Sequence, residues 1–290
     1  DKEIRDAVAE RQRAAPEGSY TGQYMRDAKS GLVAKFLDFC SKCEDNFMPL
    51  DTDLTFSEDQ VDRDDYRSKR LTYTPKDEPC PSFDLLMDTL YVKDERTKLM
   101  WSIGAIVSGD SKWIEKFIVM YGHPGSGKST VTKIINKMFD GYTTEFNAKE
   151  LTSANNQFST EVFASNPLVA IQDDGDLSKI EDNTKLNSIA SHAPVVVNQK
   201  YKAPFVMSPI CFLYMSTNKP VKITDAKSGL LRRLIDVRPS GQKLTPQEYH
   251  KAMAKIKFEY PGIAWKCLQV YNELGPYYYD DYRPNLMQEE

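Results

Sequence analysis

From residue 117 onward, short apolar runs alternate with longer segments that have helical or polar spacing. The runs are Phe117–Tyr121, 168–171, 210–216 and Leu234–Val237. Because each run is continuously apolar, it suits a strand that is buried on both faces, as in a parallel sheet. The pattern therefore predicts an α/β fold with a parallel central sheet.

Helical spacing predominates elsewhere. Apolar residues recur at helical intervals in residues 24–47, 83–108, 131–139 and 245–274. An acidic and then basic connector with two prolines near its end separates the first two of these segments. We therefore expect a helical N-terminal region over residues 1–95, a core over residues 96–245 and a helical C-terminal tail over residues 246–290.

The composition is that of an ordinary globular protein of 290 residues with a net charge of -4. Such a chain would contact nucleic acid through a local basic patch rather than through its whole surface. The sequence contains no run as long as a membrane span and no secretory signal, so we expect a cytoplasmic protein without a membrane partner. It starts at Asp1 rather than Met, which suggests a fragment of a longer protein.

Five cysteines, an odd number, fit a reducing compartment better than a disulfide framework. Cys40 and Cys43 form a C-x-x-C pair within the helical segment 24–47. A single pair is weak evidence for zinc, so packing within a helix is the favoured interpretation.

A phosphate-binding motif lies between the first apolar run and the helical segment 131–139. It fits the G-x-x-x-x-G-K-[ST] pattern in full, and together with the residue after it the motif comprises Gly122, His123, Pro124, Gly125, Ser126, Gly127, Lys128, Ser129 and Thr130. The glycines let backbone N–H groups converge on phosphate, and the helix N-terminus adds partial positive charge. We expect Lys128 to reach the β- and γ-phosphates of ATP and the Ser129 hydroxyl to bind Mg2+.

Paired carboxylates, Asp173 and Asp174, follow the second apolar run. An ATPase needs one acid for Mg2+ and one to orient or deprotonate water, so we assign Asp173 to the metal and Asp174 to the water. The alternative is that two acids merely begin a polar loop, which the preceding phosphate motif disfavours.

The third apolar run ends at Ser216 and is followed by Thr217 and Asn218. Ligands of open α/β sheets bind beyond the carboxyl ends of the strands. The Asn218 amide is therefore predicted to hydrogen-bond the γ-phosphate or the attacking water, although a simple strand-end turn is the alternative.

Two arginines, Arg232 and Arg233, stand directly before the last apolar run. A guanidinium group stabilises charge on a transferring phosphoryl and often comes from a neighbouring subunit. Arg233 is the preferred arginine finger and Arg232 the reserve, while a surface or interface salt bridge is the alternative.

The segment from Lys185 to Asn218, with KLNSIASHAPVVVNQKYKAP at its start, resembles superfamily 3 helicases. The resemblance covers about residues 115–240 and is to viral and phage primase-helicases related to the poxvirus primase-helicase, and more distantly to papillomavirus and parvovirus replicative helicases. It implies an AAA+-like P-loop NTPase core, an N-terminal helical collar and a hexameric ring. It also implies 3′ to 5′ movement on single-stranded or forked DNA.

The same resemblance implies a β-hairpin that binds single-stranded DNA in the channel of the ring. Val195–Val197 and Phe205–Met207 would form its arms, and Lys200 and Tyr201 match the family's DNA-binding positions at the tip. Lys202 would add charge. Lysine pairs with phosphate and tyrosine stacks on a base, so sequence-tolerant binding is physically reasonable, although an ordinary surface hairpin is the alternative.

Two positions depart from the family's pattern. Asp174 stands where some relatives have Glu, and Lys185 and Asn187 stand where the papillomavirus-like pattern has a basic residue that senses nucleotide across the interface. The expected function remains an ATP-driven helicase motor, the helicase part of a primase-helicase with an upstream primase or polymerase module, acting in an infected host cell if viral or phage. The alternatives are an ATP-dependent DNA-binding ring that acts as loader or scaffold, and a P-loop kinase.

Overall fold

The structure, a computed structural model, describes residues 51–285 apart from 62–66, 152–155, 176–182, 201 and 220–228, and also positions 6 and 31. The chain divides into two compact units, Asp1–Met48 and Pro49–Glu290, and the description below concerns the second. The predicted helix over residues 24–47 and its Cys40 and Cys43 pair lie outside the described residues, except for position 31.

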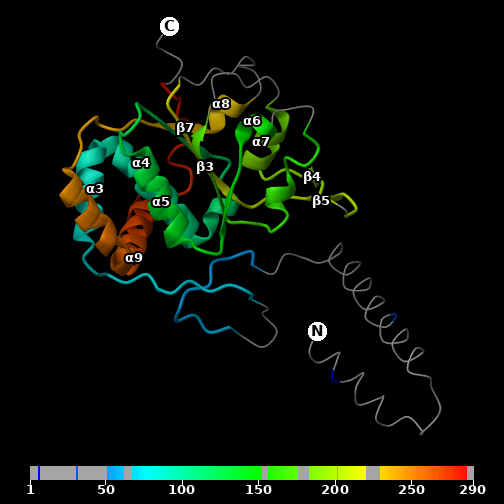
Figure 1. The fold of residues 1–290 in the computed structure, drawn as a ribbon, viewed down its shortest axis with the longest axis horizontal. Coiled ribbons are helices and arrows are strands. Elements are labelled where there is room, and N and C mark those ends of the chain that lie inside the picture. The colour runs from blue at the N-terminus through cyan, green and yellow to red at the C-terminus, as the bar shows by residue number, and fades with distance from the viewer. Residues whose placement is uncertain are drawn as a thin grey trace. The chain divides into compact units, whose positions relative to one another are not determined.

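A parallel sheet of five strands forms the centre of this unit (Figure 1). In sheet order the strands are β2 (Thr143–Glu145), β3 (Val169–Gly175), β6 (Phe212–Thr217), β1 (Phe117–Tyr121) and β7 (Leu234–Val237). Every neighbouring pair in this sheet is parallel. The predicted parallel sheet is thus confirmed, and the four apolar runs of the sequence supply four of its strands.

Helices precede the sheet and alternate with its strands. They are α3 (Pro81–Leu90), α4 (Lys93–Ser108), α5 (Lys128–Met138), α6 (Ala148–Leu151), α7 (Thr184–Ala190), α8 (Leu230–Arg233) and α9 (Pro246–Leu274), with the 3-10 turns η1 (Asp110–Lys112) and η2 (Glu161–Phe163). The single helical segment predicted over residues 83–108 is wrong in one respect. The backbone is extended at Tyr91 and Val92, which separates α3 from α4.

The core lies in two layers, one on each face of the sheet. Successive residues of a strand point to opposite faces, so Ile118 and Met120 of β1 belong to one layer and Phe117 and Val119 to the other. Helices α3, α4, α5 and α9 cover the first face, whereas α6, α7 and a β-hairpin cover the second (Figure 1). Because both faces of the sheet are covered, we expect the functional site at the ends of the strands.

Helix α9 packs closely against α4. A side-chain carbon on Gly104 would lie 2.2 Å from the carbonyl oxygen of Cys267, so only glycine permits this approach. The carboxylate of Glu259, also on α9, accepts hydrogen bonds from the backbone N–H groups of Ser82 and Phe83 at the start of α3. A negative charge at a helix N-terminus is stabilising, so α9 fixes the position of α3.

The predicted hairpin is confirmed. Strands β4 (Val195–Val197) and β5 (Phe205–Met207) pair antiparallel in a separate two-stranded sheet. Val196 lies opposite Val206, and both side chains are exposed. In the part of the chain that the structure describes, no helix combines the length and the apolar character needed to cross a membrane.

Candidate nucleotide-binding site

The phosphate motif forms the loop between the carboxyl end of β1 and the first residue of α5, Lys128. Gly125 and Gly127 have φ values of +72° and +105°, which side chains other than glycine rarely adopt. A side-chain carbon on Gly127 would also lie 2.9 Å from both terminal carbons of Leu90. These glycines let the loop curl at the start of α5, where backbone N–H groups can bind an anion.

Lys128 is buried within the loop that precedes it. Its ammonium donates to the carbonyl oxygens of Gly122, at 2.6 Å, and His123, at 3.0 Å, and to Asn218 Oδ1, at 2.7 Å. Burial lowers the pKa of Lys128, and the nearby Asp174 and Asp173 oppose that shift. The predicted Lys128 and Asn218 side chains are thus in direct contact, although 90 residues separate them.

Ser129 and Asp173 also meet at this edge of the sheet. The Ser129 hydroxyl donates to Asp173 Oδ1 at 3.0 Å, and the Ser216 hydroxyl donates to the same oxygen at 2.8 Å. Hydroxyl and carboxylate oxygens are the donors that Mg2+ prefers. No group of three or more His, Cys, Asp or Glu side chains suited to a metal occurs among the residues described, so a cation here would take its other ligands from water and phosphate, as Mg2+ does.

Asp174 is held in an unusual backbone conformation at the end of β3. Its φ is +53°, which is uncommon for any residue other than glycine. Its N–H donates to Ser216 Oγ at 2.9 Å, and its Oδ1 accepts from the Asn218 amide. Ser216 of β6 therefore binds the backbone of Asp174, and Asn218, which follows β6, binds its carboxylate. The sequence did not predict the contacts of Ser216.

The other loop residues differ in their surroundings. His123 and Pro124 are exposed, whereas Thr130 is buried and its hydroxyl lies 3.4 Å from the Tyr249 hydroxyl. The Ser126 hydroxyl is buried and has no hydrogen-bond partner in the described part of the chain. Such an atom carries a desolvation cost unless a ligand or water satisfies it, so the loop is suited to a polar ligand.

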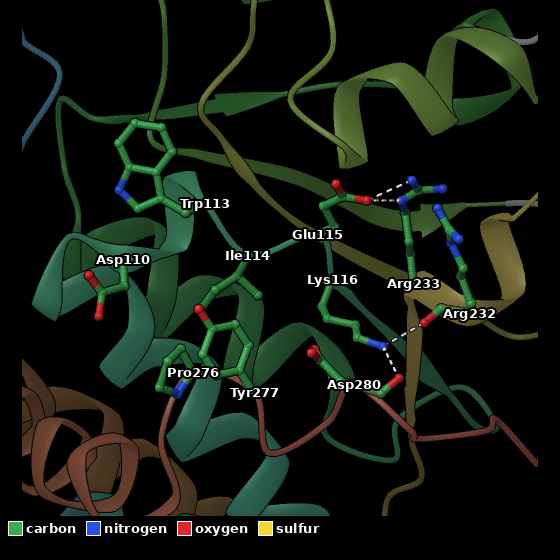
Figure 2. Close-up of a pocket in the computed structure, with 10 residues that line it drawn as sticks. All are labelled: Asp110, Trp113, Ile114, Glu115, Lys116, Arg232, Arg233, Pro276, Tyr277 and Asp280. Carbon is green, nitrogen blue, oxygen red and sulfur yellow. Dashed lines mark hydrogen bonds and ion pairs between the residues drawn. The ribbon is translucent and has the colours of Figure 1, made fainter.

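Arg233 lies at the opposite edge of the sheet, immediately before β7. Its side chain is buried, with Nη2 at 2.6 Å and Nε at 3.0 Å from Glu115 Oε2 (Figure 2). Its Nη1 lies 2.6 Å from Asn187 Oδ1. Asn187, the position that departs from the family's pattern, thus helps to hold this arginine. Glu115 and Asn187 together fix the guanidinium group in its own chain.

Arg232 is exposed and borders a pocket of about 650 Å³. Figure 2 shows that Lys116 extends across this pocket, where its ammonium donates to the carbonyl oxygens of Arg232, at 2.6 Å, and Asp280, at 3.2 Å. Burial lowers the pKa of Lys116. The exposed rings of Trp113 and Tyr277 lie at the rim of the same pocket.

Neither arginine can reach the phosphate loop of its own chain. Leu234 of β7 pairs with Phe117, at the amino end of β1, whereas the loop follows Tyr121 at the carboxyl end. At roughly 3.3 Å per residue, β1 separates these edges by about 13 Å, which is longer than an extended arginine side chain. A role for Arg232 or Arg233 in phosphate chemistry therefore requires a second copy of the chain.

The hairpin tip carries the predicted cationic side chains into solvent. Lys200 and Lys202 are exposed, and the Lys202 N–H donates to the Gln199 carbonyl oxygen at 3.3 Å, which closes a turn. Tyr201 lies outside the described residues. The DNA-binding assignment of all three residues remains a prediction.

A family profile and solved structures both match this chain. Residues 120–233 match the profile of a family described as a family of unknown function (DUF5906). A search of the curated proteins gave no match to the chain.

Solved structures similar to the chain include "The apo structure of NrS-1 C terminal region (305-718)", with 14% sequence identity and a TM-score of 0.54 over 73% of this chain and 53% of that one. Another is "The A form apo structure of NrS-1 C terminal region-CTR", with 14% identity and a TM-score of 0.52 over 69% of this chain and 49% of that one. The chain therefore spans about half the length of these structures. At this level of identity the likeness shows a shared α/β fold.

Proposed function

We propose that this chain is an ATP-driven DNA helicase motor that moves along single-stranded DNA as a hexameric ring, as part of viral or phage DNA replication. The observation that carries the proposal is the contact network at the carboxyl edge of the sheet. Lys128 contacts Asn218, Asn218 contacts Asp174, and Ser129 contacts Asp173. A lysine, a hydroxyl, two carboxylates and an amide are the groups that phosphoryl transfer to water requires.

Each side chain has a distinct role in this proposal. Lys128 would exchange its carbonyl partners for phosphate oxygens of ATP, and Ser129 and Asp173 would hold Mg2+, which offsets charge on those oxygens. Asp174 would orient the attacking water and accept its proton, since its carboxylate is exposed at the strand end. Asn218 lies between Lys128 and Asp174, so it would align the water with the phosphate.

The arginines would complete the site from the neighbouring subunit. Arg233 is the proposed finger, with Arg232 as its reserve, because both lie about one strand length from their own loop and could serve only the loop of another copy. Hydrolysis at such an interface would change how two subunits pack. The hairpin with Lys200, Tyr201 and Lys202 would then move the bound DNA strand.

The helicase assignment rests on the resemblance of residues 115–240 to superfamily 3 helicases, and the fold shared with the C-terminal region of NrS-1 supports it at the level of architecture. The collar over residues 1–95, the domain bounds at residues 95 and 245, and an upstream primase or polymerase module are further parts of the proposal.

The test is the steady-state rate of ATP hydrolysis by the purified chain with Mg2+, measured with and without single-stranded DNA. We expect hydrolysis that depends on protein concentration, because the site needs two copies, and that rises when DNA is added. Hydrolysis that does not respond to bound DNA in an assembled ring would favour the loader or scaffold instead. The absence of any hydrolysis under those conditions would contradict the enzyme assignment.

A further inference from the structure

Residues 239–245, which connect β7 to α9, lie across the phosphate loop as a strap. Ser240 anchors its first part to α3, because its N–H donates to the Leu90 carbonyl oxygen at 2.8 Å and its hydroxyl donates to that of Thr89 at 2.7 Å. Reciprocal hydrogen bonds between Thr245 and Glu248 at the start of α9 fix its end. The strap is therefore held at both ends.

The strap touches the loop along its length. The Pro239 ring comes within 3.2 Å of the point that a side-chain carbon on Gly122 would occupy. Further along, the ammonium of Lys243 lies 3.6 Å from the corresponding point on Gly125. A cation of the same chain thus lies beside the middle of the loop.

Lys243 has no role in the fold that would account for its place. Its side chain is exposed, and within the described residues its ammonium forms no hydrogen bond or ion pair. The Lys243 ammonium is therefore unengaged beside the glycine-rich loop, where an anionic ligand of the loop would meet it.

The end of helix α3 contacts both the strap and the loop and so fixes their spacing. The Leu90 carbonyl oxygen accepts the hydrogen bond from Ser240 of the strap. The Leu90 side chain packs against Gly127 of the loop, at the point that a side chain at this position would occupy. The next residue, Tyr91, donates from its hydroxyl to the Gly127 carbonyl oxygen at 3.4 Å. The spacing between Lys243 and the loop is therefore set by packing rather than by the lysine side chain alone.

We propose that Lys243 is a second phosphate-binding cation of the same subunit, which contacts the phosphate tail of a nucleotide beside Gly125. The proposal rests on the proposed function, since it assumes that the loop binds a nucleoside triphosphate. It assigns the strap a positioning role, because residues 239–242 hold the ammonium beside Gly125.

The test is the equilibrium affinity of the full chain for ATP, measured for the wild type and for Lys243→Ala. We expect Lys243→Ala to bind ATP about 10-fold more weakly, since a hydrogen bond to a charged group is worth about that factor. The control is Lys255→Ala, which removes an exposed lysine of α9 and should leave the affinity unchanged. Lys243→Arg should retain most of the affinity, and the thermal midpoints of all variants should agree.

The outcomes separate the two proposals. If the wild type binds ATP and Lys243→Ala binds it equally tightly, the role of Lys243 is overturned and the nucleotide site stands. If Lys243→Ala weakens ATP and adenosine equally, the lysine acts on the fold of the site rather than on phosphate, which also overturns the proposal. If the wild type binds no ATP, both the proposed function and the role of Lys243 fail.

Discussion

The two edges of the central sheet hold charged groups in different ways. At the carboxyl edge, Lys128, Asp173 and Asp174 contact one another through hydroxyl and amide groups, and a ligand can replace several of those contacts. At the amino edge, Arg233 is buried and bonded to Glu115 and Asn187, while its neighbour Arg232 is exposed. One edge therefore groups a lysine, two carboxylates and their polar partners within hydrogen-bonding distance, and the other holds a buried arginine beside an exposed one.

Under the proposed function, this difference would divide the nucleotide site between two subunits. A strand of five residues separates the arginines from their own loop, so under that proposal one copy of the chain would not complete its own site. Two copies that place the amino edge of one against the carboxyl edge of the other would bring the two halves together. Such a heterologous contact closes into a ring when the rotation permits.

The largest effect is expected from Lys128→Ala at the carboxyl edge. Loss of this cation should abolish ATP hydrolysis, because a fixed donor to the transferring phosphate is removed. Lys133→Ala, an exposed lysine on the same helix, is the matched control and should hydrolyse ATP at the wild-type rate. Equal rates of ATP hydrolysis for Lys128→Ala and the wild type would show that the phosphate loop takes no part in the reaction.

Substitutions of the two arginines at the amino edge should distinguish an effect on the rate of hydrolysis from an effect on stability. Arg233→Ala should lower the rate about 1,000-fold, the lower end for an arginine finger, and should also lower the thermal midpoint by about 3 °C because Glu115 and Asn187 lose their partner. Arg232→Ala should retain the thermal midpoint and lose less activity. The opposite result, with activity lost only in Arg232→Ala, would make Arg232 the arginine finger in place of Arg233.

Substitutions in the hairpin should change DNA binding without changing the charged groups at either edge of the sheet. Lys200→Ala should weaken the binding of single-stranded DNA and reduce the slope of log affinity against log salt by about 0.7, the value for one phosphate contact. Lys255→Ala again serves as the control. A slope identical to that of the wild type would show that Lys200 does not contact DNA phosphate.

The smallest effect concerns a buried thiol at the amino edge, that of Cys211, which directly precedes β6. Burial raises the pKa of Cys211 to about 12, so at pH 8 only about one thiol in 10,000 is ionised. Alkylation of the native chain at this position should therefore be very slow, should rise with pH and should become fast on unfolding. Mass spectrometry of each variant then reports whether the core around Cys211 is intact, and rapid labelling of the native wild type would contradict this packing.

The sequence predicted the parts of the fold that continuous apolar runs encode. Four strands of the sheet follow from such runs, but β2 does not, because its residues Thr143–Glu145 are polar and only three long. The phosphate motif and the acid pair were likewise recognisable from local order. That Lys128 contacts Asn218 follows from the parallel pairing of β1 with β6, which places the carboxyl ends of both strands together.

Other features of the site depend on contacts that no local pattern reveals. The left-handed backbone at Asp174 is maintained by Ser216 and Asn218, which lie more than 40 residues away in the sequence. The partners of Arg233 come from separate elements, and Lys243 belongs to no motif. A lone lysine in a loop carries no sequence signal, so only the folded strap shows that it lies beside Gly125.

The central claim, that two copies share one nucleotide site, is tested most directly by mixing two inactive chains. One chain carries Lys128→Ala, and the other carries Arg232→Gln and Arg233→Gln, with assembly of the mixture confirmed by its mass in solution. We expect ATP hydrolysis to reappear on mixing, because some interfaces then join an intact loop to intact arginines. A mixture that assembles but stays as inactive as its components would contradict a shared site.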